Sequence, residues 1–247
     1  MSTIDPDLAL TTPARTTTAT AARAPRDRAW PLWGAAAGLL GFAATVVFDA
    51  RPTSEMEAAD RGESVIVDPS LMDELTRMPN YLGFLVGFAA VAALIVFAAA
   101  WKARVETRFT RSIAARVVSG GLLVTAAGLT LAYGWKGALA NYGYDGPEAG
   151  LYEDDGLFVY FMLTDFGPYI PWLGVLIMAF ALGWMAWRER TISRVLGTVS
   201  VIYGLLVVGG FVVMGVPGLA GPASGLWLAI ACIWLSLGSS RVTERIA

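Results

Sequence analysis

Residues 81–101 read YLGFLVGFAAVAALIVFAAAW, and this stretch contains no charged side chain. An α-helix needs roughly 20 apolar residues to cross the ~30 Å hydrocarbon core of a bilayer, so the stretch is long enough to span a membrane. Lipid offers no hydrogen-bond partners to an open strand, and a helix is therefore expected. Similar apolar stretches predict five further spans, at 30–48, 117–135, 169–187, 195–215 and 220–238.

The overall composition supports a membrane protein. Of the 247 residues, 56% are hydrophobic and only 15% are charged, which are the wrong proportions for a soluble domain of this size. We therefore predict an all-α integral membrane protein with six transmembrane helices. Residues 30–247 form the transmembrane domain, and its two long outer loops are residues 50–80 and 136–168.

The charged residues between the predicted spans indicate one orientation. The positive-inside rule assigns segments rich in Lys and Arg to the cytoplasm. Both termini are therefore expected inside, and fourteen of the twenty acidic residues fall on the opposite, outer side. Fourteen of the eighteen basic residues lie in the inner segments: Arg15, Arg23, Arg26, Arg28, Lys102, Arg104, Arg108, Arg111, Arg116, Arg188, Arg190, Arg194, Arg241 and Arg245.

The N-terminal segment 1–29 is rich in Thr, Ala and Arg and has no apolar run before Trp30. No cleaved signal peptide is expected from this pattern. Such a segment cannot bury enough surface to fold, so we predict a disordered cytoplasmic tail. The abundance of Ala, Gly, Val and Arg is typical of a GC-rich bacterial genome, and it indicates a bacterial plasma membrane.

An internal repeat is the second pattern in the chain. The motif GLLxxAA occurs at 38–44 and 121–127, and a related GLLxxGG occurs at 204–210, at equal spacing along the chain. The segments 75–85 and 163–173 also share the pattern LTxxxxYxx(F/W)L. These matches favour three tandem helical hairpins in parallel orientation. Coincidence in a composition rich in Gly, Leu and Ala is the alternative.

The residues that are missing exclude much chemistry. The chain has no His and a single Cys232, which excludes His-ligated haem, most zinc and copper sites, and catalytic triads that need His. It also has no P-loop and no dinucleotide-binding glycine motif. We therefore expect no cofactor, no nucleic-acid partner and no enzymatic activity. An enzyme that uses outer carboxylates is the least favoured alternative.

The two long outer loops predict short surface helices. In the first loop, Ser70 and Asp73 resemble a capping box at the start of a helix over 70–78. In the second, residues 157–166 are predicted to form a helix packed on the outer face. Gly167, Pro168 and Pro171 should interrupt the helix before the fourth span.

Six polar residues near the outer ends of the spans are the candidate site. In the repeat, Arg77 and Asp165 occupy equivalent positions with opposite sign, so complementary charge would hold related hairpins together. Charges near membrane depth usually pair and also mark functional sites. Structural ion pairs and a ligand- or ion-handling site are therefore the two interpretations. The candidates are Asp49, Arg77, Lys136, Asp165, Tyr81 and Tyr169.

The second outer loop also carries an acidic cluster. Carboxylate oxygens are the ligands that hard divalent cations prefer, but the spacing here is not that of an EF-hand. A solvated acidic loop is the favoured interpretation, and no metal ion is predicted. The weak cation-binding candidates are Asp145, Glu148, Glu153, Asp154 and Asp155.

Two classes of function follow from these patterns. The first is a non-enzymatic multi-pass plasma-membrane protein, an accessory, regulatory or scaffolding component whose acidic outer loops contact a membrane or extracytoplasmic protein partner. The second is a small-solute or cation transporter or channel, whose acidic rim concentrates cations. The absence of charges in the middle of the spans favours the first class. The lipid bilayer is the other expected partner.

Overall fold

The computed structural model describes residues 29–238 and 240–244. Apart from Ala29, the predicted tail lies outside the described residues. Every regular element among the described residues is helical. The main helices are α1 (Leu32–Phe42), α2 (Thr53–Asp60), α3 (Arg77–Trp101), α4 (Ile113–Tyr142), α5 (Asp154–Phe166), α6 (Leu173–Trp187), α7 (Arg194–Met214) and α8 (Ala220–Leu237). The short π or 3-10 elements are η1 (Ala43–Val47), η2 (Pro69–Glu74), η3 (Lys102–Glu106), η4 (Ile170–Trp172), η5 (Pro217–Leu219) and η6 (Arg241–Thr243).

Five of the helical segments are long and apolar enough to cross a membrane. They are Arg77–Glu106, Ile113–Tyr142, Asp154–Trp187, Arg194–Met214 and Ala220–Leu237. A sixth segment, Leu32–Val47, is apolar but shorter. The predicted all-helical class of membrane protein is therefore confirmed, while the number of spans stays a prediction.

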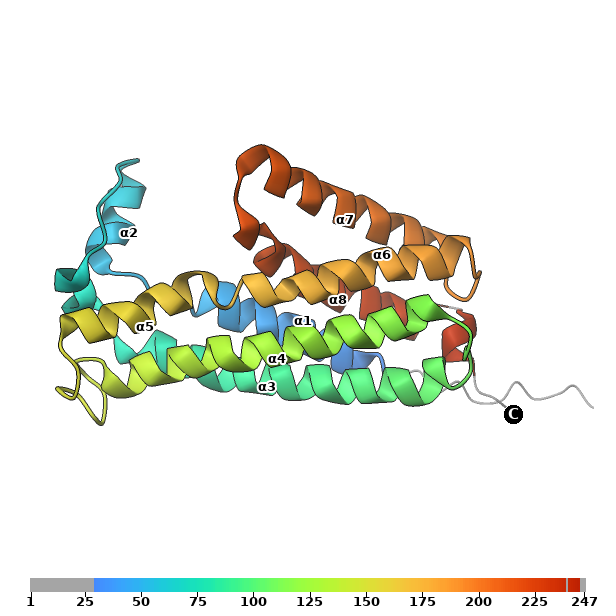
Figure 1. Cartoon of the computed structure of the whole chain (residues 1–247), viewed down its shortest axis with the longest axis horizontal. Helices are drawn as coiled ribbons and strands as arrows, with labels where there is room; N and C mark the ends of the chain where they lie inside the picture. Colours follow the sequence, from blue (N-terminus) through green and yellow to red (C-terminus); the bar gives the residue numbers. More distant parts are fainter. Residues whose placement is uncertain (1–28, 239, 245–247) are drawn as a thin grey trace, which may run out of the picture.

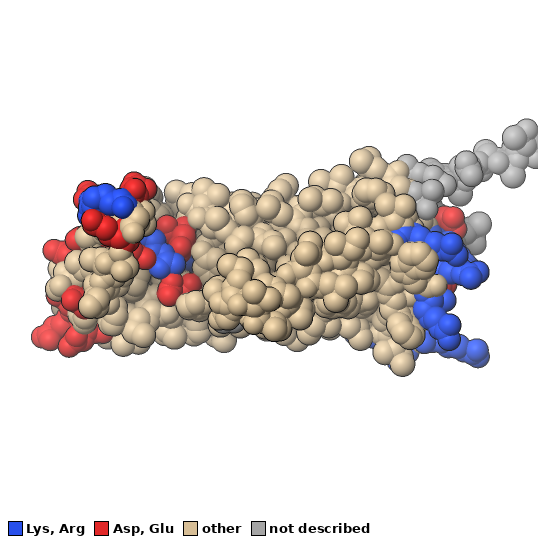
Figure 2. All heavy atoms as spheres, turned by 90° about the horizontal axis from the view of Figure 1, so that it is seen from above, with Lys and Arg blue, Asp and Glu red and all other residues tan. Residues whose placement is uncertain are grey.

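The charged side chains separate along the long axis of the molecule. Figure 2 shows acidic side chains gathered at one end, most of the basic side chains at the other, and a broad uncharged surface between them. We call the end that carries α2 and the start of α5 the acidic end (Figure 1). The basic end carries η3 and the connection between α6 and α7. This separation is the one expected where water meets both ends of an apolar bundle.

Helices that follow one another in the predicted spans are also neighbours in space (Figure 1). α1 packs between α3 and α8, and α4 packs against α3 and α6. α7 lies at the edge of the bundle and packs mainly on α6. A buried core of small and large apolar side chains runs through the bundle. The tandem repeat is not tested by this packing and stays a prediction.

The acidic end contains a second, smaller core. It consists of Met72, Leu75, Leu139, Leu157 and Phe161. α4 extends past the predicted end of its span at residue 135, and α5 lies alongside this extension and roughly in line with α6 (Figure 1). η2 packs on α5 and completes the core. The acidic end is therefore a folded part of the bundle.

Two details of the outer loops differ from the prediction. The helix expected over 157–166 begins earlier, at Asp154, and packs along α4 rather than lying across the outer face, because Leu157 and Phe161 are buried against Leu139. The helix expected over 70–78 is a 3-10 helix that ends at Glu74, because the chain becomes extended before α3 begins. The break expected between residues 167 and 171 is confirmed.

Glycine allows a close crossing of α4 and α6. Gly121 of α4 faces Gly174 of α6, and a Cβ atom on either residue would overlap the carbonyl oxygen of the other. Small residues at such crossings let two backbones approach in a membrane protein. Gly120, one position away, has no atom near the place where its Cβ would stand. The two adjacent glycines therefore differ only in their packing.

We expect Gly121→Ala to lower the free energy of unfolding by about 2 kcal/mol more than Gly120→Ala does, because only the first variant overpacks the α4–α6 crossing. Both variants change helix propensity equally, so their difference isolates the crossing. The measurement is unfolding in mild detergent. Equal stability of the two variants would show that the crossing is not close.

Candidate functional site

Lys136 is the only charged residue that is fully buried among the residues that the structure describes. It lies on α4, and its Nζ donates hydrogen bonds to the carbonyl oxygens of Ala44, at 3.0 Å, and Phe48, at 2.7 Å. These carbonyls lie in and just after η1, where a helix end leaves acceptors without partners in the helix. Lys136 therefore caps the end of the α1–η1 segment from a neighbouring helix.

The charge of Lys136 is balanced by Asp49. The Oδ1 atom of Asp49 lies 4.0 Å from the Lys136 Nζ. A buried ammonium group is costly unless hydrogen bonds and an opposite charge compensate it, and here both are present. Tyr169 adds a hydroxyl that donates to Asp49 Oδ2 at 3.3 Å. One carboxylate thus receives partners from α4 and from the segment before α6.

Arg51 extends these contacts to α2 and α5. Its Nε lies 3.0 Å from Asp49, its Nη1 lies 3.3 Å from Glu55, and its Nη2 lies 2.6 Å from Asp165. Burial alone would lower the pKa of the Arg51 guanidinium, but the carboxylates, first of all those of Asp49 and Asp165, outweigh it and raise the pKa above its ordinary value. Arg51 therefore stays charged. We call Asp49, Arg51, Glu55, Lys136, Asp165 and Tyr169 the charge network.

The structure brings together four of the six predicted site residues: Asp49, Lys136, Asp165 and Tyr169. The other two lie together at a separate place, where the Arg77 guanidinium stands 5.0 Å from the centre of the Tyr81 ring. The Nε of Arg77 donates to the carbonyl oxygen of Ala140 at 3.1 Å.

The charge opposite Asp165 is therefore Arg51, and the expected complementarity of Asp165 with Arg77 was wrong. The prediction missed Arg51 and Glu55. Their spacing of four residues, directly after Asp49, was the available signal.

Polar groups deeper in the bundle also bind one another. The hydroxyls of Thr45 and Tyr133 lie 3.0 Å apart, and Tyr133 donates to the carbonyl oxygen of Gly41 at 3.3 Å. Thr125 donates to the carbonyl oxygen of Pro171 at 2.9 Å, next to the break before α6. These bonds satisfy groups that would otherwise be costly in an apolar surrounding. These hydrogen bonds hold neighbouring helices together, and no bound ligand is needed to explain them.

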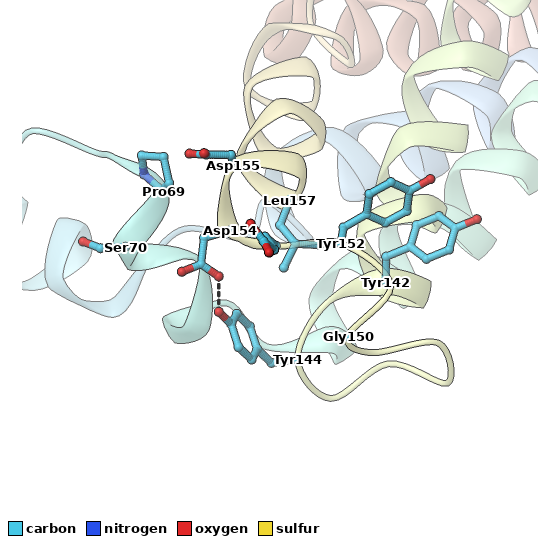
Figure 3. Close-up of a pocket in the computed structure, with 10 residues that line it drawn as sticks. Pro69, Ser70, Tyr142, Tyr144, Gly150, Tyr152, Asp154, Asp155 and Leu157 are labelled. Carbon is cyan, nitrogen blue, oxygen red and sulfur yellow. Dashed lines mark hydrogen bonds between the residues drawn. The ribbon is translucent and has the colours of Figure 1, made fainter.

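The acidic loop borders a surface pocket with a volume of about 700 Å³ (Figure 3). The Tyr144 hydroxyl donates to Asp154, and this bond raises the pKa of Tyr144. The backbone N–H of Arg77 donates to Asp145 at 2.9 Å, so this carboxylate is bound elsewhere. The pocket is lined by Pro69, Ser70, Tyr142, Tyr144, Gly150, Tyr152, Glu153, Asp154, Asp155 and Leu157.

The five weak cation-binding candidates do not share one place. Glu153, Asp154 and Asp155 line the pocket, whereas Asp145 and Glu148 do not. Within residues 29–238 and 240–244, no group of three or more Asp, Glu, Cys or His side chains is arranged to hold a metal ion. The acidic loop is therefore a charged surface beside a pocket lined by tyrosine side chains.

Comparison with known proteins finds no family model, no curated protein and no solved structure that matches the chain. Function is therefore inferred from the geometry of the two ends of the bundle and from the charge network.

We expect Lys136→Met to lower the free energy of unfolding by about 3 kcal/mol, because it removes both caps on η1 and one of the two cations that balance Asp49. Lys102→Met is the matched control, since Lys102 is exposed at the basic end and its loss should change stability by less than about 0.5 kcal/mol. Unfolding in mild detergent measures both. Equal losses for the two variants would contradict a structural role for Lys136.

Proposed function

We propose that the chain is a non-enzymatic, multi-pass protein of the plasma membrane with six spans and both termini in the cytoplasm. Its role is that of an accessory, regulatory or scaffolding component, and its acidic end binds a protein partner outside the cytoplasm. The observation that carries this proposal is the folded acidic end, in which a separate core and the charge network hold an acidic surface in a defined shape.

The arrangement of the charged side chains at the acidic end supports the binding of a protein partner rather than transport. The charge network joins its acids and bases to one another, so each of its charged groups already has a structural partner of opposite sign. By contrast, Asp60 and Asp155 are exposed to solvent, and they lie at the acidic end. Electrostatic complementarity of such a surface speeds association and selects partners of opposite charge. The proposed partner therefore presents a basic surface.

The sixth span is the α1–η1 segment. Its eleven residues of α1 and five of η1 cover about 24 Å at the rise of an α-helix, slightly less than the hydrocarbon thickness. α1 nevertheless packs along α3 and α8, both of which are long enough to cross. Lys136 satisfies the carbonyls at its outer end, which supports a span that ends within the protein rather than in water.

A labelling experiment tests the orientation. We expect Glu57→Cys on α2 to react with a membrane-impermeant maleimide in intact cells, and Arg188→Cys after α6 to react only after the membrane is opened. Both positions are exposed, while the native Cys232 is buried and should stay silent. Labelling of Arg188→Cys in intact cells, with Glu57→Cys protected, would reverse the topology.

A cross-linking experiment tests the partner. We expect a photo-reactive phenylalanine at Tyr144, which is exposed at the acidic end, to form one protein adduct of defined mass in membranes. The same residue at Trp187, which is exposed near the basic end, should not form it. The adduct should weaken in an Asp154→Asn/Asp155→Asn variant that keeps wild-type stability. Equal adducts from both positions, or lipid adducts alone, would contradict the proposal.

The alternative function is a carrier or channel for small solutes or cations. The observation that favours it is the pocket of about 700 Å³ at the acidic end, which would collect cations. Native mass spectrometry of the purified protein separates the two functions. A retained small molecule or ion without a protein partner would support the alternative.

A further inference from the structure

We propose that the basic end holds a binding site for a phosphate group, carried either by the head group of an anionic lipid or by a free phosphate compound. A pocket of about 390 Å³ opens at this end. Its walls come from the connection between η3 and α4, the connection between α6 and α7, and η6. Three segments far apart in sequence therefore meet at one hollow.

Arginine dominates this pocket. Arg108, Arg111 and Arg241 all line it. In the part of the chain that the structure describes, the guanidinium groups of Arg111 and Arg241 form no ion pair and donate no hydrogen bond, and both side chains are exposed. A guanidinium group offers a planar fork of donors that matches two phosphate oxygens. The observation that carries the proposal is that two guanidinium groups without a described partner lie beside one pocket.

Arg108 holds the wall that contains Arg241. Its Nη1 donates to the carbonyl oxygens of Arg241 and Glu244, the latter at 2.8 Å. Its Nη2 lies 3.6 Å from the Glu244 carboxylate. The guanidinium also stacks 5.4 Å from the centre of the Phe109 ring. Arg108 therefore fixes the segment after α8 against the α3–α4 connection, and it places Arg241 at the pocket.

The start of α4 adds positive potential. Ser112 lines the pocket and caps this helix, because its hydroxyl oxygen accepts the N–H of Ala115 at 3.0 Å. α4 contains 30 residues, and the positive end of a helix dipole favours an anion near its first turn. This contribution supplements the arginines and would not make a site without them.

Among the described residues, Glu189 is the one carboxylate that lines the pocket. It accepts a hydrogen bond from the Ser112 hydroxyl at 2.7 Å, which holds it at the α4 side of the hollow. Three arginines against one acid leave the lining positive. The volume exceeds that of a phosphate group alone and falls within the usual range for a small ligand, so it accommodates the organic part of a phosphate ester. Basic pockets at the ends of membrane helices bind lipid head groups in this way.

The site lies at the opposite end of the bundle from the charge network and does not depend on the proposed partner binding. Its test uses the full chain in mild detergent and two titrations at matched ionic strength. Inorganic phosphate is compared with chloride, and short-chain phosphatidylglycerol is compared with phosphatidylcholine. Binding is followed by calorimetry. The test variant is Arg111→Gln/Arg241→Gln, and the matched control is Arg188→Gln, an exposed arginine outside the pocket.

We expect the double variant to weaken binding by about tenfold or more, because each arginine supplies charge-assisted hydrogen bonds. The control should retain wild-type affinity. Glu189→Gln keeps the acceptor for Ser112 and removes the opposing charge, so it should tighten binding, by up to about fivefold. A gain of affinity cannot result from a damaged fold.

The two ligand sources give different results. Binding of inorganic phosphate that the double variant loses identifies a free phosphate compound. Binding of phosphatidylglycerol alone, with the same loss, identifies a lipid head group. The proposal is overturned if neither probe binds, or if Arg188→Gln weakens binding as much as the double variant does.

Discussion

The ammonium group of Lys136 closes the end of the α1–η1 segment, and the acidic end is built outward from this contact. Carbonyl groups at a helix end in an apolar surrounding need donors, and water is absent there. A buried lysine supplies them, but its own charge then needs a carboxylate, which is Asp49. Asp49 in turn binds Arg51, and Arg51 reaches Asp165 at the end of α5. A single constraint on backbone carbonyls thus leads to contacts among α1, α4 and α5.

Most of the apolar helices were predictable because length and hydrophobicity alone identify a stretch that lipid can surround. The predicted stretch 81–101 ends at the last residue of α3, and 195–215 agrees with α7 to within one residue. The extension of α4 to Tyr142 was not predicted, because residues 136–142 carry polar groups that look like a loop. Their stability comes from Leu139, whose partners lie on η2 and α5. Such long-range packing leaves no local signal.

Long-range packing also explains why the candidate site was predicted only in part. Asp49, Lys136 and Asp165 were predicted because they are charged residues at the ends of spans, and they share one network. Arg51 looked like an ordinary loop residue, although it is the residue that joins Asp49 to Asp165. Its partner on α5 is within reach only because α5 packs along the extended α4. α2 was missed as well; its start is held by the Ser54 N–H, which donates to Glu74 at 2.7 Å.

Lys136 is a buried structural group and not part of an aqueous path. The chain has two lysines, so peptide mass spectrometry after treatment with a small, water-soluble amine-reactive ester reads each one separately. In the folded protein in detergent, exposed Lys102 should be modified within minutes, whereas Lys136 should stay unmodified until the protein is unfolded. Modification of Lys136 in the folded protein at a rate close to that of Lys102 would contradict the account.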